Sequence, residues 1–240
     1  MRVIVCENYD EMSLQGAKLF ESQIRLKPNS ILGLATGSTP IGMYQNLIKM
    51  YKEEGLDFSK ITSFNLDEYY PISQDNDQSY RYFMNEQLFN HINIDKEKTF
   101  VPNGEAKDSD LECKQYEEKL AQYGGVDIQL LGIGRNGHIG FNEPGDKLYA
   151  STHKTGLTQD TIEANSRFFA DIKDVPTQAL TMGIGSIMKA KTIVLLASGK
   201  NKHDAVKALL DDYITTEIPC TLLKAHPDFI LICDKDAYEG

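Results

Sequence analysis

Short apolar runs alternate with longer amphipathic stretches along almost the whole chain, and this alternation is the feature that most restricts its fold. The apolar runs, rich in Val, Ile and Leu, are predicted to be strands: Arg2–Cys6, Ile31–Ala35, Ile61–Leu66, Val126–Ile133, Thr192–Ala197 and Phe229–Cys233. Several of them are apolar on both faces, as in parallel strands that helices cover on each side. The sequence therefore predicts an open, doubly wound, mostly parallel sheet in a Rossmann-like, three-layer α/β/α fold.

Helices are predicted between these runs, in stretches with apolar residues at spacings of three and four. The stretches cover residues 10–26, 40–54, 77–92, 108–123, 176–190 and 201–211. No Pro/Ser-rich linker, repeat or low-complexity segment divides the chain. Residues 1–240 are therefore interpreted as a single α/β domain. The least regular segment, 141–175, is predicted to be a loop-rich insertion or lid.

The charge balance and the thiols indicate the class of protein. The chain has 25 basic and 35 acidic residues and a net charge of -10, which argues against a nucleic-acid or anionic-membrane partner. Its N-terminal apolar run is too short for a signal peptide or a membrane span. Four cysteines, Cys6, Cys113, Cys220 and Cys233, show no CxxC spacing. We expect reduced thiols in a cytoplasmic protein, without a zinc site.

Polar clusters directly follow four of the predicted strands. They are Thr36–Pro40, Asp67–Tyr70, Arg135–His138 and Ser198–Lys202. In doubly wound sheets, ligands bind beyond the carboxyl ends of the strands. If the strands are parallel, all four clusters lie on one rim, and the sequence predicts one site there.

The first of these clusters has the composition of an anion-binding turn. Gly37 allows a sharp turn, Ser38 or Thr39 can cap the next helix, and Pro40 suits the first helical position. A helix start presents free N–H groups and a partial positive charge, which suit a phosphate. A capped turn that binds nothing would have the same sequence, so this alternative stays open.

The run GIGRNG satisfies the pattern G-x-G-x-x-G, which is shared with dinucleotide-binding turns. That interpretation requires a long helix to begin at once. Here the chain continues with HIGFNEPGD, which breaks helices. We therefore expect no nucleotide, and interpret the glycines as allowing close backbone approach to a small ligand.

Candidate acid–base residues lie in the second and third clusters. His138 is close in sequence to Asn136 and Glu143, and neighbouring carboxylates can prepare a histidine for proton transfer. A packed turn histidine is the alternative. Asp67, beside Glu68 at a strand end, is either a tuned base or a solvated loop acid. Two cations, Arg167 and Lys202, are candidate phosphate partners or ordinary surface charges.

The strings LATGSTP, FNLDEYY, GIGRNGHIGFNEPG, ANSRFF and PCTLLKAHP resemble those of glucosamine-6-phosphate deaminases. They extend from about residue 30 to 235 in the order found in that family. The related 6-phosphogluconolactonases share the fold and the phosphate turn, but NLDEYY and HIGFNEPG resemble the deaminases much more. The resemblance implies conversion of glucosamine 6-phosphate and water to fructose 6-phosphate and ammonia, in amino-sugar catabolism, without a cofactor or metal.

The resemblance also implies roles for single residues. Asp67 would be the general base that moves a proton between C2 and C1 of the sugar. His138 would help to open the sugar ring, and Glu143 would be its acidic partner. The phosphate-binding positions would be Gly37, Ser38, Thr39, Arg167 and Lys202. Lys200 competes with Lys202 for its role, and the register of the following helix favours Lys202.

The chain departs from the family pattern at position 136 and in length. Many deaminases have Asp where this chain has Asn136, and an amide cannot stabilise an imidazolium through charge. Glu143 is therefore expected to be the main charged partner of His138.

The chain ends earlier than the larger allosteric relatives, so we expect a monomer or small homo-oligomer without activation by N-acetylglucosamine 6-phosphate. A 6-phosphogluconolactonase and a non-catalytic sugar-phosphate sensor remain as alternatives.

Overall fold

A parallel sheet forms the centre of the molecule. The computed structural model describes residues 1–166, 169, 171, 173 and 175–240. Within these residues the sheet has seven strands in the order β1-β10-β9-β6-β2-β3-β5, all paired in parallel. The strands are β1 (Arg2–Cys6), β2 (Ile31–Leu34), β3 (Thr62–Asn65), β5 (Thr99–Phe100), β6 (Ile128–Leu131), β9 (Thr192–Ala197) and β10 (Phe229–Asp234). This arrangement confirms the predicted doubly wound α/β class.

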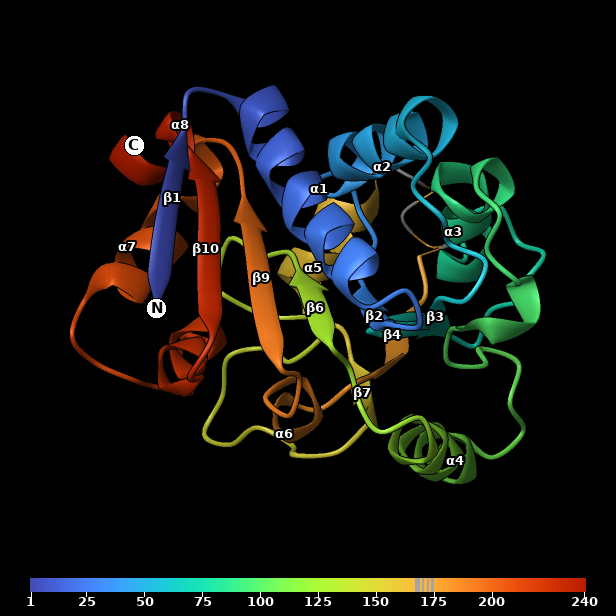
Figure 1. Ribbon diagram of the computed structural model, residues 1–240. Helices are drawn as coiled ribbons and strands as arrows, with labels where there is room; N and C mark the ends of the chain where they lie inside the picture. Colours follow the sequence, from blue (N-terminus) through green and yellow to red (C-terminus); the bar gives the residue numbers. More distant parts are fainter. Residues whose placement is uncertain (167–168, 170, 172, 174) are drawn as a thin grey trace.

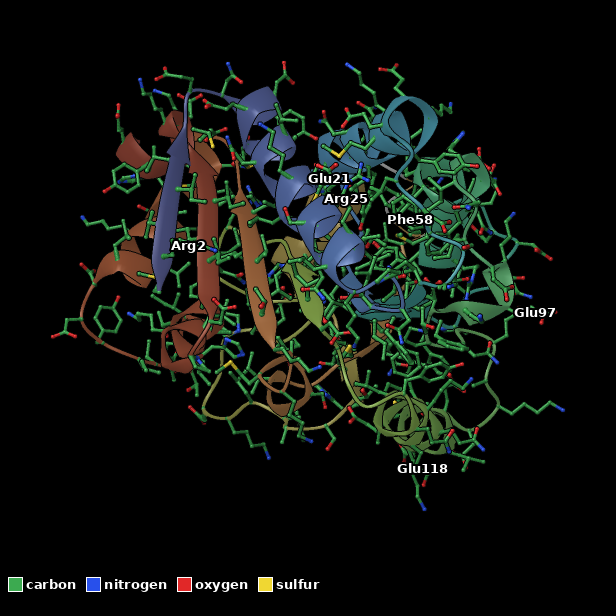
Figure 2. All side chains as sticks on the ribbon, in the orientation of Figure 1. Arg2, Glu21, Arg25, Phe58, Glu97 and Glu118 are labelled. Atoms are coloured by element: carbon green, nitrogen blue, oxygen red, sulfur yellow. The ribbon has the colours of Figure 1, made fainter. Side chains whose placement is uncertain are left out.

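Helices cover both faces of this sheet. The helices α1 (Tyr9–Leu26) and α2 (Ile41–Glu54) lie across its front, and α7 (His203–Leu210) lies behind β1 and β10 (Figure 1). Gly16 of α1 brings the helix backbone close to Leu196 of β9, because a Cβ there would be 3.3 Å from that side chain. Arg25 of α1 forms an ion pair with Glu21 at 2.8 Å and donates to the carbonyl of Glu54, the last residue of α2, at 3.0 Å (Figure 2).

The other helices surround this core. They are α3 (Tyr80–Gln87), α4 (Ser109–Gln122), α5 (Gln159–Asn165), α6 (Ile184–Ile187) and α8 (Lys235–Glu239), with 3-10 helices at Phe89–His91, Lys96–Lys98, Lys200–Lys202 and Pro219–Ala225. Among them, α4 packs on the sheet through Tyr116, whose ring lies edge-on to Phe64 of β3 at 5.7 Å between centroids. No helix in the described part of the chain is long and apolar enough to cross a lipid bilayer.

A second, antiparallel sheet adjoins the first at the end of β3. It has the order β4-β8-β7, with β4 at Asp67–Tyr70, β8 at Gln178–Thr181 and β7 at His153–Gly156. Leu66 joins the two sheets, because its N–H donates to Leu34 at 3.2 Å and its carbonyl accepts from Met182 at 2.7 Å. The next residue, Asp67, therefore lies at the junction of the sheets, paired in register with Thr181.

The structure corrects several predicted elements. The helix predicted at 176–190 is wrong in its first part, since Gln178–Thr181 is a strand and only Ile184–Ile187 is helical. This strand pairs with β4 on one side and β7 on the other, and such distant pairing overrides local apolar spacing. The stretch 77–92 is helical only over Tyr80–Gln87 before a short 3-10 turn. The segment 141–175 contains β7 and α5, so it is more regular than predicted.

Candidate active site

A cavity of about 440 Å³ opens beyond the carboxyl ends of the central strands. The segments that follow β2, β3, β6 and β9 all contribute to its wall. They supply Ala35–Thr39, Leu66 and Asp67, Gly132–Arg135 with His138, and Asn201 with Lys202. The four polar clusters that the sequence placed on one rim thus line one cavity, as the parallel arrangement of the strands requires.

The turn after β2 is held in place by a tyrosine from another helix. Gly37 has a φ of 95°, which favours glycine. The structure corrects the predicted start of the next helix: α2 begins at Ile41, Pro40 is its N-cap rather than its first residue, and neither Ser38 nor Thr39 is the cap. Pro40 supplies no side-chain cap. Instead the Tyr9 hydroxyl accepts a hydrogen bond from the N–H of Gly42 at 2.8 Å and donates to the carbonyl of Thr39 at 3.1 Å.

Two adjacent carboxyl groups lie in different environments at the junction of the sheets. Glu68 is 1% exposed, and it accepts backbone N–H groups of Tyr69 at 2.9 Å, Tyr80 at 2.8 Å and Arg81 at 3.0 Å. Burial raises its pKa to about 7 in spite of these donors. Asp67 lines the cavity and lacks such donors among the described contacts, and burial followed by the charge of Glu68 raises its pKa to about 8. Of the two carboxyl groups, Asp67 therefore binds a proton more strongly.

The imidazole of His138 rests against the backbone of Gly134. A Cβ at position 134 would lie 2.3 Å from Nδ1 of the ring, so only glycine leaves room for it. The loop is closed by hydrogen bonds from the N–H of Gly134 to the carbonyl of His138 and from the N–H of Gly137 to the carbonyl of Gly134, both 3.0 Å. Gly134 thus accommodates the imidazole, and it also lines the cavity together with Gly132, so close approach of a ligand to these glycines stays a prediction.

Glu143 is the carboxylate nearest to this imidazole. Its Oε2 is 3.3 Å from Nδ1 of His138, an ion-pair distance without hydrogen-bond alignment. The same oxygen accepts from Nδ2 of Asn136 at 2.9 Å, and Oε1 accepts from the hydroxyl of Thr161 at 2.5 Å. Burial alone would raise the pKa of Glu143, but the contacts with His138, Thr161 and Asn136 together lower it to about 2.

Asn136 contacts the acid and the backbone. Besides its bond to Glu143, its Oδ1 accepts from the backbone N–H of His138 at 3.1 Å. The amide therefore orients the carboxylate and closes the turn, and Glu143 is the charged group next to the ring.

Of the predicted cations, Lys202 lines the cavity. The Nζ of its competitor Lys200 instead lies 3.4 Å from the carbonyl of Gly240. Arg167 lies outside the residues that the structure describes. The four cysteines are buried free thiols, and the described residues contain no group of three or more His, Cys, Asp or Glu side chains placed to hold a metal ion.

Comparison with known proteins identifies the family. The family model described as glucosamine-6-phosphate isomerases/6-phosphogluconolactonase matches residues 9–231. The chain belongs to this family. Two similar relatives are glucosamine-6-phosphate deaminases: one from Clostridium perfringens strain 13 is 59% identical, covering 99% of this chain and 98% of its own. The other, from Thermoanaerobacter pseudethanolicus, is 55% identical, covering 99% and 94%.

Solved structures extend the likeness to the fold. A monomeric glucosamine-6-phosphate deaminase superposes with a TM-score of 0.97 at 46% identity, covering 99% of this chain and 98% of that one. A 6-phosphogluconolactonase from Thermotoga maritima has a TM-score of 0.76 at 20% identity, covering 98% and 99%. At that identity the likeness shows a shared fold alone.

Several cavity residues of this family member were not selected from the sequence. Arg135 lines the wall within a cluster that the sequence did indicate, yet it was not considered as a cation. Tyr80, at the start of α3, and Thr161 and Glu163, on α5, also line it. No local motif marks these three, since each reaches the cavity through the packing of its helix.

Proposed function

We propose that this chain is a glucosamine-6-phosphate deaminase of the isomerising type. It converts D-glucosamine 6-phosphate and water to D-fructose 6-phosphate and ammonia. Relatives named for this activity are 55% and 59% identical over nearly the whole chain. Lactonases of similar fold are far more distant, at 20% identity in the case of the Thermotoga maritima protein.

The observation that carries this proposal is that one cavity joins the Gly37–Thr39 turn and Lys202 with Asp67 and His138. We assign the turn, Lys202 and Arg167 to the phosphate. Because the phosphate is remote from the reacting carbons, its binding energy can hold C1 and C2 of the sugar at the acid–base groups.

Ring opening is assigned to His138 with Glu143. The imidazole takes the proton of the C1 hydroxyl and returns it to the ring oxygen as the C1–O bond breaks, which leaves the open-chain aldehyde. A neighbouring carboxylate stabilises the imidazolium formed on the way. Glu143 can fill that position, since it stays ionised near neutral pH and lies 3.3 Å from Nδ1.

Proton transfer between carbons is assigned to Asp67. Its carboxylate removes the proton from C2 while the aldehyde oxygen on C1 takes a proton from the ammonium group on C2, which gives an enol with a neutral amino group. The carboxyl group of Asp67 then delivers its proton to C1. The nitrogen on C2 becomes an iminium group, water adds to C2, and ammonia leaves. A base whose pKa is about 8 binds that proton strongly yet ionises near neutral pH, which suits this task. A positively charged amino group on the bound sugar would further favour the ionised form.

The test is coupled detection of ammonia released from glucosamine 6-phosphate. We expect turnover in the unmodified protein and a fall of about 10²-fold or more in Asp67→Asn, the scale for loss of a general base. Inhibition by inorganic phosphate should be almost unchanged in that variant. Hydrolysis of 6-phosphogluconolactone without ammonia would identify a lactonase instead. Binding of the sugar phosphate without turnover would identify a sensor.

We also propose that the protein works as a monomer in the cytoplasm. A solved relative at 46% identity is described as monomeric, and a net charge of -10 opposes self-association. The molecular mass of the protein, measured in solution, should be that of one chain, 27.0 kDa.

A further inference from the structure

Hydroxyl groups connect the helix α5 to the carboxylate of Glu143. Thr161, on the first turn of α5, is 4% exposed, and its Oγ1 donates to Oε1 of Glu143 at 2.5 Å. Thr158, the N-cap of α5, lies beside it: its Oγ1 is 3.1 Å from Oγ1 of Thr161 and 3.4 Å from Oε1 of Glu143. Since the shorter bond comes from Thr161, this hydroxyl is the main contact between α5 and the acid.

The two oxygens of Glu143 face opposite partners. Oε1 faces Thr161, whereas Oε2 accepts from Asn136 at 2.9 Å and lies 3.3 Å from Nδ1 of His138. A carboxylate is planar and rigid, so a group that holds one oxygen also sets the direction of the other. The side chain of Glu143 is only 9% exposed, and water therefore competes little for these positions.

The same helix also borders the cavity. Thr161 and Glu163 of α5 both line it, as His138 does. The position of α5 is thereby connected to the substrate space and, through one hydroxyl, to the acid next to the imidazole.

We propose that Thr161 is a positioning residue, which couples α5 to the acid–base pair by holding Glu143 in the orientation that serves His138. This inference rests on the proposed function, because the orientation matters for the ring-opening step assigned above. Thr161 acts through Glu143 and need not touch the sugar.

The activity test uses Thr161→Val, which keeps the shape of the side chain and removes the hydroxyl, and Thr161→Ser, which restores the hydroxyl. We expect kcat for ammonia release to fall about tenfold or more in the valine variant, the scale for losing a hydrogen bond to a charged group, with little change in KM. The serine variant should keep most of the activity. Thr155→Val is the matched control, because Thr155 lies on β7 and its hydroxyl bonds to the carbonyl of Gly156.

A double-mutant cycle separates positioning from packing. In the background of Glu143→Gln, Thr161→Val should have almost no further effect on kcat, because the group through which it acts is already altered. If the fall in kcat of the double variant equals the product of the falls in the two single variants, the proposal is overturned, because Thr161 then acts independently of Glu143.

A second readout does not depend on activity. The carboxyl carbon of Glu143, identified in NMR spectra by its loss in Glu143→Gln, should show no titration in the unmodified protein between about pH 3.5 and 6. Its pKa should rise in Thr161→Val, because that hydroxyl helps to hold the pKa at about 2. An unchanged titration together with unchanged kcat would overturn the proposal. If the unmodified protein releases no ammonia, the proposed function fails, and this titration still tests the contact.

Discussion

At the residue scale, the site requires a glycine at position 134 as well as its acids and bases. The imidazole of His138 occupies the space that a Cβ at position 134 would need, at 2.3 Å from Nδ1. The position of the ring against Gly134 also sets its contact with Glu143. If the ring moved toward Gly134 or away from it, the distance of 3.3 Å between Nδ1 of His138 and Oε2 of Glu143 would change.

We therefore predict that Gly134→Ala lowers kcat by about 10²-fold while the protein stays folded, because a displacement of about 1 Å in a catalytic group has effects of that size. The measurement is steady-state ammonia release together with circular dichroism. Gly145→Ala is the control, because a Cβ there would meet only the carbonyl of Lys147, at 3.9 Å. Equal activity in the two variants would show that the imidazole does not need its position against Gly134.

At the scale of elements, α1 and α2 work together on the turn that we assign to the phosphate. Tyr9 begins α1, yet its hydroxyl bonds to the first turn of α2 and to the carbonyl of Thr39. A second tyrosine, Tyr44 of α2, donates to the carbonyl of Ala35 at 2.6 Å from within the core. The turn between β2 and α2 is thus braced by tyrosines on both helices.

We predict that Tyr9→Phe raises KM several-fold and leaves kcat less affected, because it loosens a binding turn and leaves the acid–base groups in place. The variant loses the bonds to Gly42 and Thr39, and at about 0.5–1.5 kcal/mol each their loss corresponds to roughly a fivefold change or more. Inorganic phosphate should inhibit the variant more weakly by a similar factor. Tyr82→Phe, on α3 and partly exposed, is the matched control; weakened phosphate binding in both variants would contradict the assignment.

At the scale of the whole molecule, buried carboxyl groups at the two ends of the parallel strands have pKa values shifted in opposite directions. Near the amino ends of the strands, Asp127 accepts from Lys27 at 2.6 Å, Lys191 at 2.7 Å and the N–H of Ile31 at 2.8 Å. Burial alone would raise its pKa, but these donors lower it. At the carboxyl edge, Asp67 is buried beside Glu68 and its pKa is raised to about 8. The first acid stabilises the folded state when ionised, and the second destabilises it.

The sign for Asp67 follows from its raised pKa. The unfolded chain loses this proton near pH 4 and the folded protein near pH 8, so stability falls as pH rises between these values. Asp67→Asn removes this penalty. We predict that it raises Tm, with a larger gain at pH 8 than at pH 5, in thermal unfolding followed by circular dichroism.

Asp127→Asn is the control with the same chemical change. The pKa of Asp127 is lowered, so its contribution is present above the ordinary Asp pKa and is lost as pH falls below it. This variant should lower Tm at both pH 5 and pH 8. A gain in Tm for Asp67→Asn that did not depend on pH would show that Asp67 does not hold a proton in the folded protein.

The sequence by itself determined the parallel sheet and the rim on which the site lies. Apolar periodicity is a local property, and the strands Arg2–Cys6 and Thr192–Ala197 were predicted with the bounds that the structure has. The carboxyl ends of parallel strands share one edge, so the clusters with Asp67, His138 and Lys202 could be placed together before any contact was known.

Only the tertiary structure decided how these groups are supported. Gln178–Thr181 is a strand because β4 and β7 pair with it. Tyr9 reaches Gly42 across 33 positions and Thr161 reaches Glu143 across 18. Nothing in the sequence next to these residues specifies such partners, because the contacts exist only once separate helices and strands have packed. The raised pKa of Asp67 also depends on tertiary structure, because it results from burial at the junction of the two sheets.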